Sequence, residues 1–182
     1  MYWRMAVLSI VGRSTAAGDA MIKETLIQQF STCYDQNGWF VAVRNALDGV
    51  TAEQAIWKPE GADNSIRETL AHLSYYNHAY LQRFKGIDYE YTAADNDATF
   101  KAGSSEADWE TEVARFDSIM TQWRDLLNAA DESKFDQPVP TKPERRWSEL
   151  LADVNAHNAY HGGQILLLRK LQGSWNPEKG VS

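Results

Sequence analysis

Residues 152–168 read ADVNAHNAYHGGQILLL, and this stretch determines how the rest of the chain is interpreted. Apolar residues before and after it recur at spacings of three and four, which predicts one helix from about Trp147 to Leu171. The buried seam of this helix is expected to contain Trp147, Leu150, Val154, His157, His161, Gln164, Leu168 and Leu171. Two histidines therefore occupy positions that would otherwise hold apolar core residues.

Three more segments show a helical period. They run from about Ile22 to Leu47, from Ser65 to about Gly86, and from Ser104 or Ser105 to about Ala130. Ser65 and Glu68 form a capping-box pattern at the start of the second helix. The first helix is expected to bury Leu26, Phe30, Cys33, Phe40 and Leu47 on one seam. No strand-like alternation recurs, so the sequence predicts an all-α fold, a four-helix bundle.

The connections between these helices differ in length and composition. One helical turn is expected after Thr51, and residues 86–103 form a long connection without a clear period. Residues 131–145 contain three prolines, and their flanks could pair as a small ribbon. Because the second connection is long, the bundle need not alternate up and down, and a crossover between the second and third helices is allowed.

Length and composition fit one folded domain. The chain has 182 residues, 43% of them hydrophobic, with seven tryptophans, which is enough for a sizeable core. We expect a mobile N-terminal extension over residues 1–20, a single domain over residues 21–175, and a C-terminal tail over residues 176–182. No apolar run approaches the roughly 18 residues of a membrane span, so no membrane partner is expected.

The net charge and the single cysteine limit which binding partners, metal sites and locations are expected. The formal net charge of −7 argues against nucleic-acid binding, which requires clustered Lys and Arg. Cys33 is the only cysteine, which excludes an intrachain disulfide and a cysteine-based zinc site. A reducing, cytoplasmic location is therefore expected.

The histidine spacing suggests a metal site. His157 and His161 lie four residues apart on one helix face, a spacing at which one helix can supply two ligands to a single ion. His72, at the edge of the second helix's apolar stripe, is the third candidate, whereas His78 lies on a mostly polar edge and is left out. Three buried imidazoles each need a polar partner, and one divalent cation satisfies all three, which favours metal over separately hydrogen-bonded core histidines.

Other chemistries have less support. A carboxylate-bridged di-iron bundle needs Glu-x-x-His pairs on two helices, and none is present because Glu68 precedes His72 by four residues. There is no H-E-x-x-H motif, phosphate loop or Rossmann glycine pattern. A Ser/His/Asp triad is left open by the sequence, but no nucleophile-elbow motif supports it.

Two stretches of the chain form longer motifs: WKPEGADNSIRETLAHL at residues 57–73 and HNAYHGGQILLLRKLQG at residues 157–173. Together they resemble the DinB/YfiT-like superfamily of bacterial four-helix-bundle proteins. The resemblance spans about residues 21–173 and leaves out the first twenty. It implies a bundle with a long crossover between helices 2 and 3, and a metal triad of His72, His157 and His161 in a protein that is often a homodimer.

The resemblance also implies a class of activity. Family members bind one divalent metal ion, for which zinc and nickel are the leading expectations and manganese and iron the alternatives. Known activities are thiol-dependent and include S-transferases that use a low-molecular-weight thiol and a related maleylpyruvate isomerase. For this chain we expect a small-molecule substrate and a metal-dependent transferase or hydrolase. The alternatives are a non-catalytic bundle that binds metal or a small ligand and a bundle that acts only through protein contacts.

Helical spacing also indicates candidate roles for residues around the triad. Three imidazoles leave at least one coordination position for water or substrate. Asp153 and Glu68, one turn before His157 and His72, are candidates to orient ligand rings. Gln164 is a candidate to hydrogen-bond a ligand, and Tyr76 and Tyr160 are candidates to line a pocket. No catalytic residue is assigned.

Gly162 and Gly163 weaken the last helix by roughly 1 kcal/mol each relative to alanine. Either they allow a neighbouring helix or partner chain to approach closely, or they leave space beside the open coordination position. Both glycines turn away from the histidine face, so close packing is the favoured interpretation.

Overall fold

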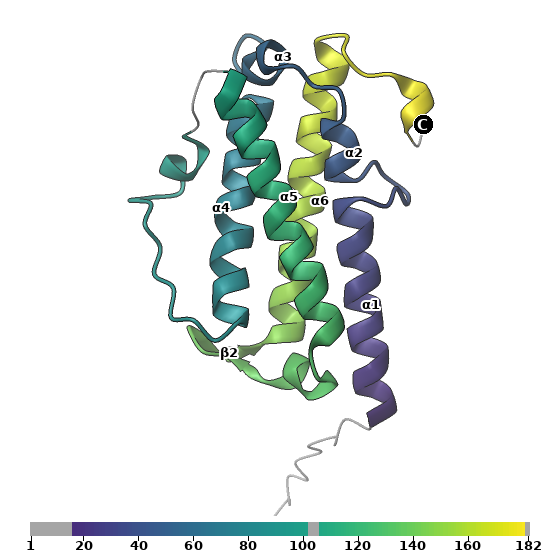
Figure 1. Ribbon diagram of the computed structural model, residues 1–182, viewed down its shortest axis with the longest axis vertical. Coiled ribbons are helices and arrows are strands. Elements are labelled where there is room, and N and C mark those ends of the chain that lie inside the picture. The colour runs from purple at the N-terminus through teal and green to yellow at the C-terminus, as the bar shows by residue number, and fades with distance from the viewer. Residues whose placement is uncertain (1–15, 102–105, 181–182) are drawn as a thin grey trace, which may run out of the picture.

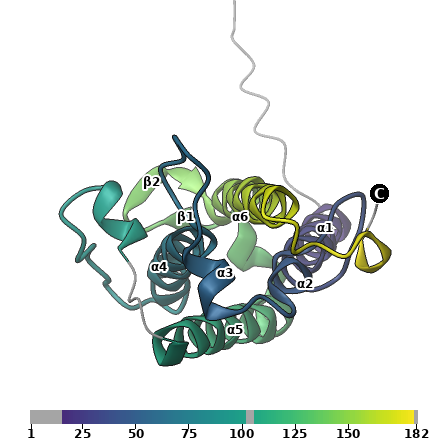
Figure 2. The same cartoon turned by 90° about the horizontal axis from the view of Figure 1, so that it is seen from above.

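The computed structural model describes residues 16–101 and 106–180. Its elements in chain order are α1 (Ala16–Tyr34), α2 (Val43–Leu47), α3 (Ala52–Ile56), α4 (Ile66–Phe84), the 3-10 turn η1 (Asp97–Phe100), α5 (Glu106–Ala129), the 3-10 turn η2 (Glu132–Asp136), β1 (Pro138–Val139), β2 (Lys142–Arg146), α6 (Trp147–Leu171) and the 3-10 turn η3 (Pro177–Lys179). The predicted all-α bundle is confirmed, with α1, α4, α5 and α6 as its four long helices (Figures 1 and 2).

The long connection between α4 and α5 is a crossover. Figure 1 shows α1 and α6 running in one direction along the bundle, and α4 and α5 both running in the other. The chain therefore returns along the outside of α4 before α5 begins, and η1 lies on this return path. The crossover matters for function because it places η1 against α4, near the predicted histidines.

Several predicted local structures are confirmed. The Ser65 and Glu68 capping box starts α4, and a second box, between Thr51 and Gln54, starts α3 in the expected helical turn. The proline-containing connection pairs as the short antiparallel ribbon β1–β2. The last helix has the predicted limits. The expected start of the third helix, Ser104 or Ser105, lies outside the described residues.

The prediction of one continuous first helix over residues 22–47 is wrong. The chain leaves the helix after Tyr34 and resumes as α2 at Val43. Asn37 stabilises this break, because its side-chain carbonyl accepts a hydrogen bond from the Ala42 amide at 3.0 Å. A Cβ atom on Gly38 would lie 2.7 Å from Thr32 Cγ2, so a larger residue there would require the Thr32 side chain to shift.

Two residues placed on buried seams are exposed. Phe40 follows the break in the first helix and is 38% exposed, and Leu171, in the last turn of α6, is 58% exposed. The start of the chain also differs from expectation, since α1 begins at Ala16, inside the segment predicted as an extension. The remainder of that segment, residues 1–15, lies outside the described residues.

The centre of the bundle contains a polar pair as well as large apolar side chains. Phe116, Met120 and Trp123 of α5 are almost fully buried. Asn77 of α4 and Asn158 of α6 exchange two side-chain hydrogen bonds, of 2.7 and 3.1 Å, so both buried amides are satisfied. This pair fixes the axial position of α4 relative to α6, the two helices that carry the histidines.

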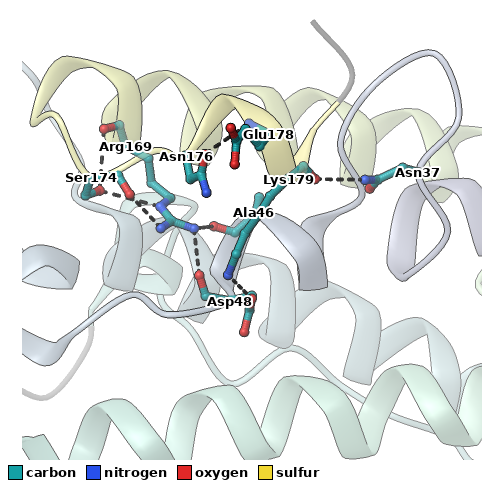
Figure 3. Close-up of polar contacts among 8 residues, drawn as sticks. All are labelled: Asn37, Ala46, Asp48, Arg169, Ser174, Asn176, Glu178 and Lys179. Atoms are coloured by element: carbon teal, nitrogen blue, oxygen red, sulfur yellow. Dashed lines mark hydrogen bonds and ion pairs between the residues drawn. The ribbon is translucent and has the colours of Figure 1, made fainter.

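The C-terminal segment packs against α2 through a buried arginine (Figure 3). Arg169 is 5% exposed and donates to the carbonyl oxygens of Ala46, Asp48 and Ser174 at 2.8, 2.9 and 2.8 Å. Lys179 adds an ion pair with the Asp48 carboxylate at 2.7 Å. These contacts hold α2 beside the upper half of α6 as drawn in Figure 1. Among the described residues, no helix is both long enough and apolar enough to cross a membrane.

Candidate metal centre

The fold brings the three predicted histidines into one cluster. His72 comes from the second turn of α4, and His157 and His161 come from the middle of α6. The Nε2 atoms of His72 and His157 are 3.0 Å apart, and one ring nitrogen from each of the three residues lies within 4.8 Å of the others. His72 and His161 are buried, and His157 is half-buried. The three side chains could therefore hold one metal ion.

Hydrogen bonds fix two of the rings. The Thr99 hydroxyl donates to the Asn96 carbonyl at 2.5 Å, so its oxygen accepts the Nδ1–H of His72 at 2.6 Å. His161 donates its Nδ1–H to Gln164 Oε1 at 2.6 Å. In both rings the proton is thus held on Nδ1, which leaves the lone pair of Nε2 available. Such outer partners are characteristic of metal-ligating histidines.

Burial keeps the cluster uncharged. Desolvation lowers the pKa of His72 to about 3, with further lowering from His161 and His157. Desolvation and the proximity of His161 lower the pKa of His157 to about 4. Burial also lowers the pKa of His161, against an opposing effect of its bond to Gln164. Neutral imidazole is the form that binds a metal ion.

The crossover supplies one wall of the cluster. The Phe100 ring stacks on His72, with centroids 3.9 Å apart and planes at 13°. Arg83 of α4 holds the crossover in place, because its guanidinium donates to the Tyr89 carbonyl at 3.0 and 3.1 Å and to the Tyr91 hydroxyl at 3.1 Å. A second anchor is the Tyr75 hydroxyl, which accepts the Ala93 amide at 2.9 Å.

The comparison with protein families agrees with this architecture. A family model described as the DinB superfamily matches residues 41–165, which is more than half of the chain. The chain belongs to the DinB superfamily. The matched region includes all three histidines, and it confirms the resemblance inferred from the two sequence motifs. Among curated proteins, a search finds no match to this chain.

Thr99, Asn96 and Phe100 were not predicted for this DinB-superfamily site. They lie in a connection without helical or strand periodicity, so no pattern placed them beside His72. The available signal was local: Asp95 accepts the Ala98 amide at 2.8 Å, a turn that Asp commonly starts. Such a signal predicts a turn but not its neighbour in space.

The two acidic candidates make other contacts. Glu68 accepts the Ser65 amide at 2.7 Å and pairs with Lys58 at 3.1 Å, so its carboxylate caps α4. Asp153 pairs with Arg145 at 2.5 Å and is largely exposed. Neither carboxylate contacts a histidine ring in the described part of the chain, and Gln164 is the predicted partner that does.

The tyrosine candidates differ in position. Tyr76 lies edge-on to His72 and His157, at centroid distances of 4.9 and 5.7 Å, and its hydroxyl donates to Asn96 Oδ1 at 3.1 Å. Tyr160 contacts the His161 ring edge-on at 5.0 Å but is 64% exposed. His78, which was left out of the site, packs its ring against Tyr89 at 5.3 Å and is not among the clustered histidines.

The two glycines of α6 have different surroundings. A Cβ atom on Gly162 would lie 3.0 Å from Val43 Cγ2, so this glycine allows α2 to pack closely. Nothing among the described residues lies within 4 Å of a Cβ on Gly163. The packing interpretation therefore holds for Gly162, and contacts within the described chain give no reason for Gly163.

A cavity adjoins the histidines. Its volume is about 260 Å³, and it extends from His72 and His157 along α4 and α6 to Tyr80 and Lys142. A larger depression of about 770 Å³ lies between α5 and the segment from α2 to α3 and contains no histidine. The smaller cavity is therefore the one next to the candidate metal ligands.

Proposed function

We propose that this DinB-superfamily protein holds one divalent metal ion between His72, His157 and His161 and uses it as a metal-dependent enzyme, of the thiol S-transferase or hydrolase type. The observation that carries this proposal is the convergence of three neutral imidazoles, two of them with Nδ1 already bonded to protein oxygens. The family resemblance implies a triad at these same positions.

The donor set fits such an ion. Imidazole nitrogen suits zinc and nickel, the metals proposed first, and also iron. His157 is the ring whose Nδ1 has no hydrogen-bond partner among the described residues. It can therefore carry its proton on Nδ1 and turn the lone pair of Nε2 toward His72. Without an ion, His157 Nε2–H can instead donate to His72 across the 3.0 Å gap.

The surroundings support a reactive site rather than a purely structural one. Three protein ligands leave room for water or substrate, whereas structural zinc sites usually have four. When bound, the ion would lower the pKa of a coordinated water or thiol, or polarise a substrate oxygen. Thr99 and Gln164 keep the ring protons on Nδ1, and Phe100 and Tyr76 cover His72 and limit access of water.

The first test is metal content. Protein purified without chelator or nickel resin is expected to carry about one divalent ion per chain, and His157→Ala should lose it. A content near zero that Zn²⁺, Ni²⁺, Mn²⁺ or Fe²⁺ cannot restore would contradict the proposal. His78→Ala is the matched control, since this histidine is on the same helix as His72 but outside the cluster.

The second test addresses catalysis. Transfer of a low-molecular-weight thiol to monochlorobimane should depend on the metal, disappear in His157→Ala and persist in His78→Ala. A protein that binds one ion and shows no turnover with thiol or ester substrates would be the non-catalytic binding bundle. We also expect a homodimer, which sedimentation equilibrium measures directly.

A further inference from the structure

We propose that the cavity beside the histidines takes a small carboxylic acid, whose carboxylate is bound by Lys142 and Arg145 of β2 while its other end faces the metal ligands. This inference rests on the proposed function, because it assigns a substrate class to the same site. It is carried by the position and charge of the cavity wall that β2 supplies.

The cavity has two chemically different ends. His72 and His157 line one end, and Lys142 and Arg145 line the other. Asp153, the partner of Arg145, lies four residues before His157, and Tyr80, which contacts Lys142, lies eight residues after His72. At 1.5 Å of rise per helical residue, the cationic end begins about 6 to 12 Å from the level of the histidines. A small molecule can therefore reach both ends.

The cationic end of the cavity contains an ammonium group, that of Lys142, without an acidic partner among the described residues. Arg145 is paired with Asp153 at 2.5 Å. Within the described residues, the Lys142 ammonium makes its hydrogen bond and its ring contact with Tyr80, its nitrogen lying 3.5 Å from the hydroxyl and 6.0 Å from the ring centroid. No carboxylate lies within 4.0 Å of Lys142 in the described ranges. Of the charged residues that line the cavity, Lys142 and Arg145 are cationic and Asp153 is anionic; Glu149, outside the lining, also acts electrostatically on Arg145. In a chain with a formal net charge of −7, the Lys142 ammonium, which has no carboxylate partner among the described residues, is the group on this wall that would attract an anion.

The middle of the cavity is suited to an uncharged spacer. Val154 of α6 and the Tyr76 ring line it at levels between the histidines and the cationic end, and Leu150 lines it at the level of the cationic end. Apolar walls reduce the water that competes for a carboxylate, and hydrogen bonds between an ammonium and a carboxylate are stronger than neutral ones. At about 260 Å³ the cavity is at the small end of ligand sites, which favours a compact molecule.

A matched pair of thiols tests this inference. The probes are 6-mercaptohexanoate and 6-mercaptohexanamide, which differ only in the terminal charge, and both are titrated calorimetrically into zinc-loaded protein. We expect the acid to bind on the order of tenfold more tightly than the amide. Lys142→Gln should remove this preference, Lys142→Arg should retain most of it, and Lys170→Gln, an exposed lysine on α6, should leave it unchanged.

Zinc binding is measured separately for each variant, so the two proposals can fail separately. Equal binding of acid and amide by zinc-loaded wild-type protein, or an undiminished preference in Lys142→Gln with normal zinc uptake, would overturn this inference and leave the metal proposal intact. Failure of the wild-type protein to take up metal would overturn both. Circular dichroism of Lys142→Gln verifies the fold, and the Lys142→Arg variant tests the charge if the glutamine variant is unstable.

Discussion

Thr99→Val is the substitution that best tests how the crossover supports the histidine cluster. Valine keeps the branched shape of threonine, so it removes the hydroxyl without opening a cavity. The change deletes the acceptor of His72 Nδ1–H at 2.6 Å and the donor to the Asn96 carbonyl at 2.5 Å. Thr99 is 5% exposed and His72 is 3% exposed, so water cannot readily replace the lost acceptor.

Two magnitudes follow from this geometry. A buried donor left without a partner costs about 1–3 kcal/mol, so urea unfolding of the metal-free variant should show a loss of that size. Because the ring of His72 also loses its orientation, metal affinity should fall by about 10- to 100-fold in a competition titration against a chelator. Thr99 is thus expected to act on the proposed metal ion through His72.

Thr69→Val is the control. Thr69 is equally buried on α4, but its hydroxyl donates to the Ser65 carbonyl at 2.8 Å and contacts no histidine. This variant should lose about 0.5–1.5 kcal/mol of stability and keep wild-type metal affinity. The reasoning is refuted if Thr99→Val binds metal within twofold of wild type, or if both variants weaken metal binding equally.

Three further predictions concern stability. Gly163→Ala should stabilise the protein by about 0.5–1 kcal/mol because no atom lies near the added Cβ. Gly162→Leu should destabilise it by about 1–3 kcal/mol because the new side chain would meet Val43. Melting temperatures that shift in the same direction for both variants would contradict this difference in packing. Arg169→Met should cost about 2–4 kcal/mol in urea unfolding, against almost nothing for the exposed Lys170→Met. Metal-free protein should lose stability as the pH falls from 6.5 toward 3, because His72 stays neutral in the folded state but takes up a proton in the unfolded state. This histidine alone should account for a loss on the order of 2 kcal/mol by pH 5. A urea midpoint that does not change with pH would refute this prediction.

The bundle could be predicted because its signals are local. Apolar spacing of three and four, the Ser65 capping box and the limits of α6 each depend on residues within a few turns of one another. The break after Tyr34 was missed because the apolar period continues through it. The break is stabilised by the hydrogen bond of the Asn37 side chain to the Ala42 amide, and at Gly38 a side chain would crowd Thr32; neither feature changes the spacing of apolar residues.

In the candidate site, too, some contacts could be predicted from local spacing and others could not. His157 and His161 could be paired from their spacing, and Gln164 could be placed beside them, since one helix positions all three. The acidic candidates Glu68 and Asp153 were also chosen by helical spacing, yet their carboxylates turn to Lys58 and Arg145. Spacing along a helix gives the side of the helix but not the partner that a flexible side chain finds.

The sequence by itself thus determines the helices, the histidine face of α6 and the resemblance to the DinB superfamily, because each depends on neighbours along the chain. Only the tertiary structure decides that His72 meets His157 at 3.0 Å, that Thr99 holds the ring of His72, and that Lys142 faces the same cavity. These contacts join residues 27 to 85 positions apart in the chain. They form because the crossover and the ribbon fold back on α4 and α6, where packing and hydrogen bonding offset the conformational entropy lost on ordering the chain.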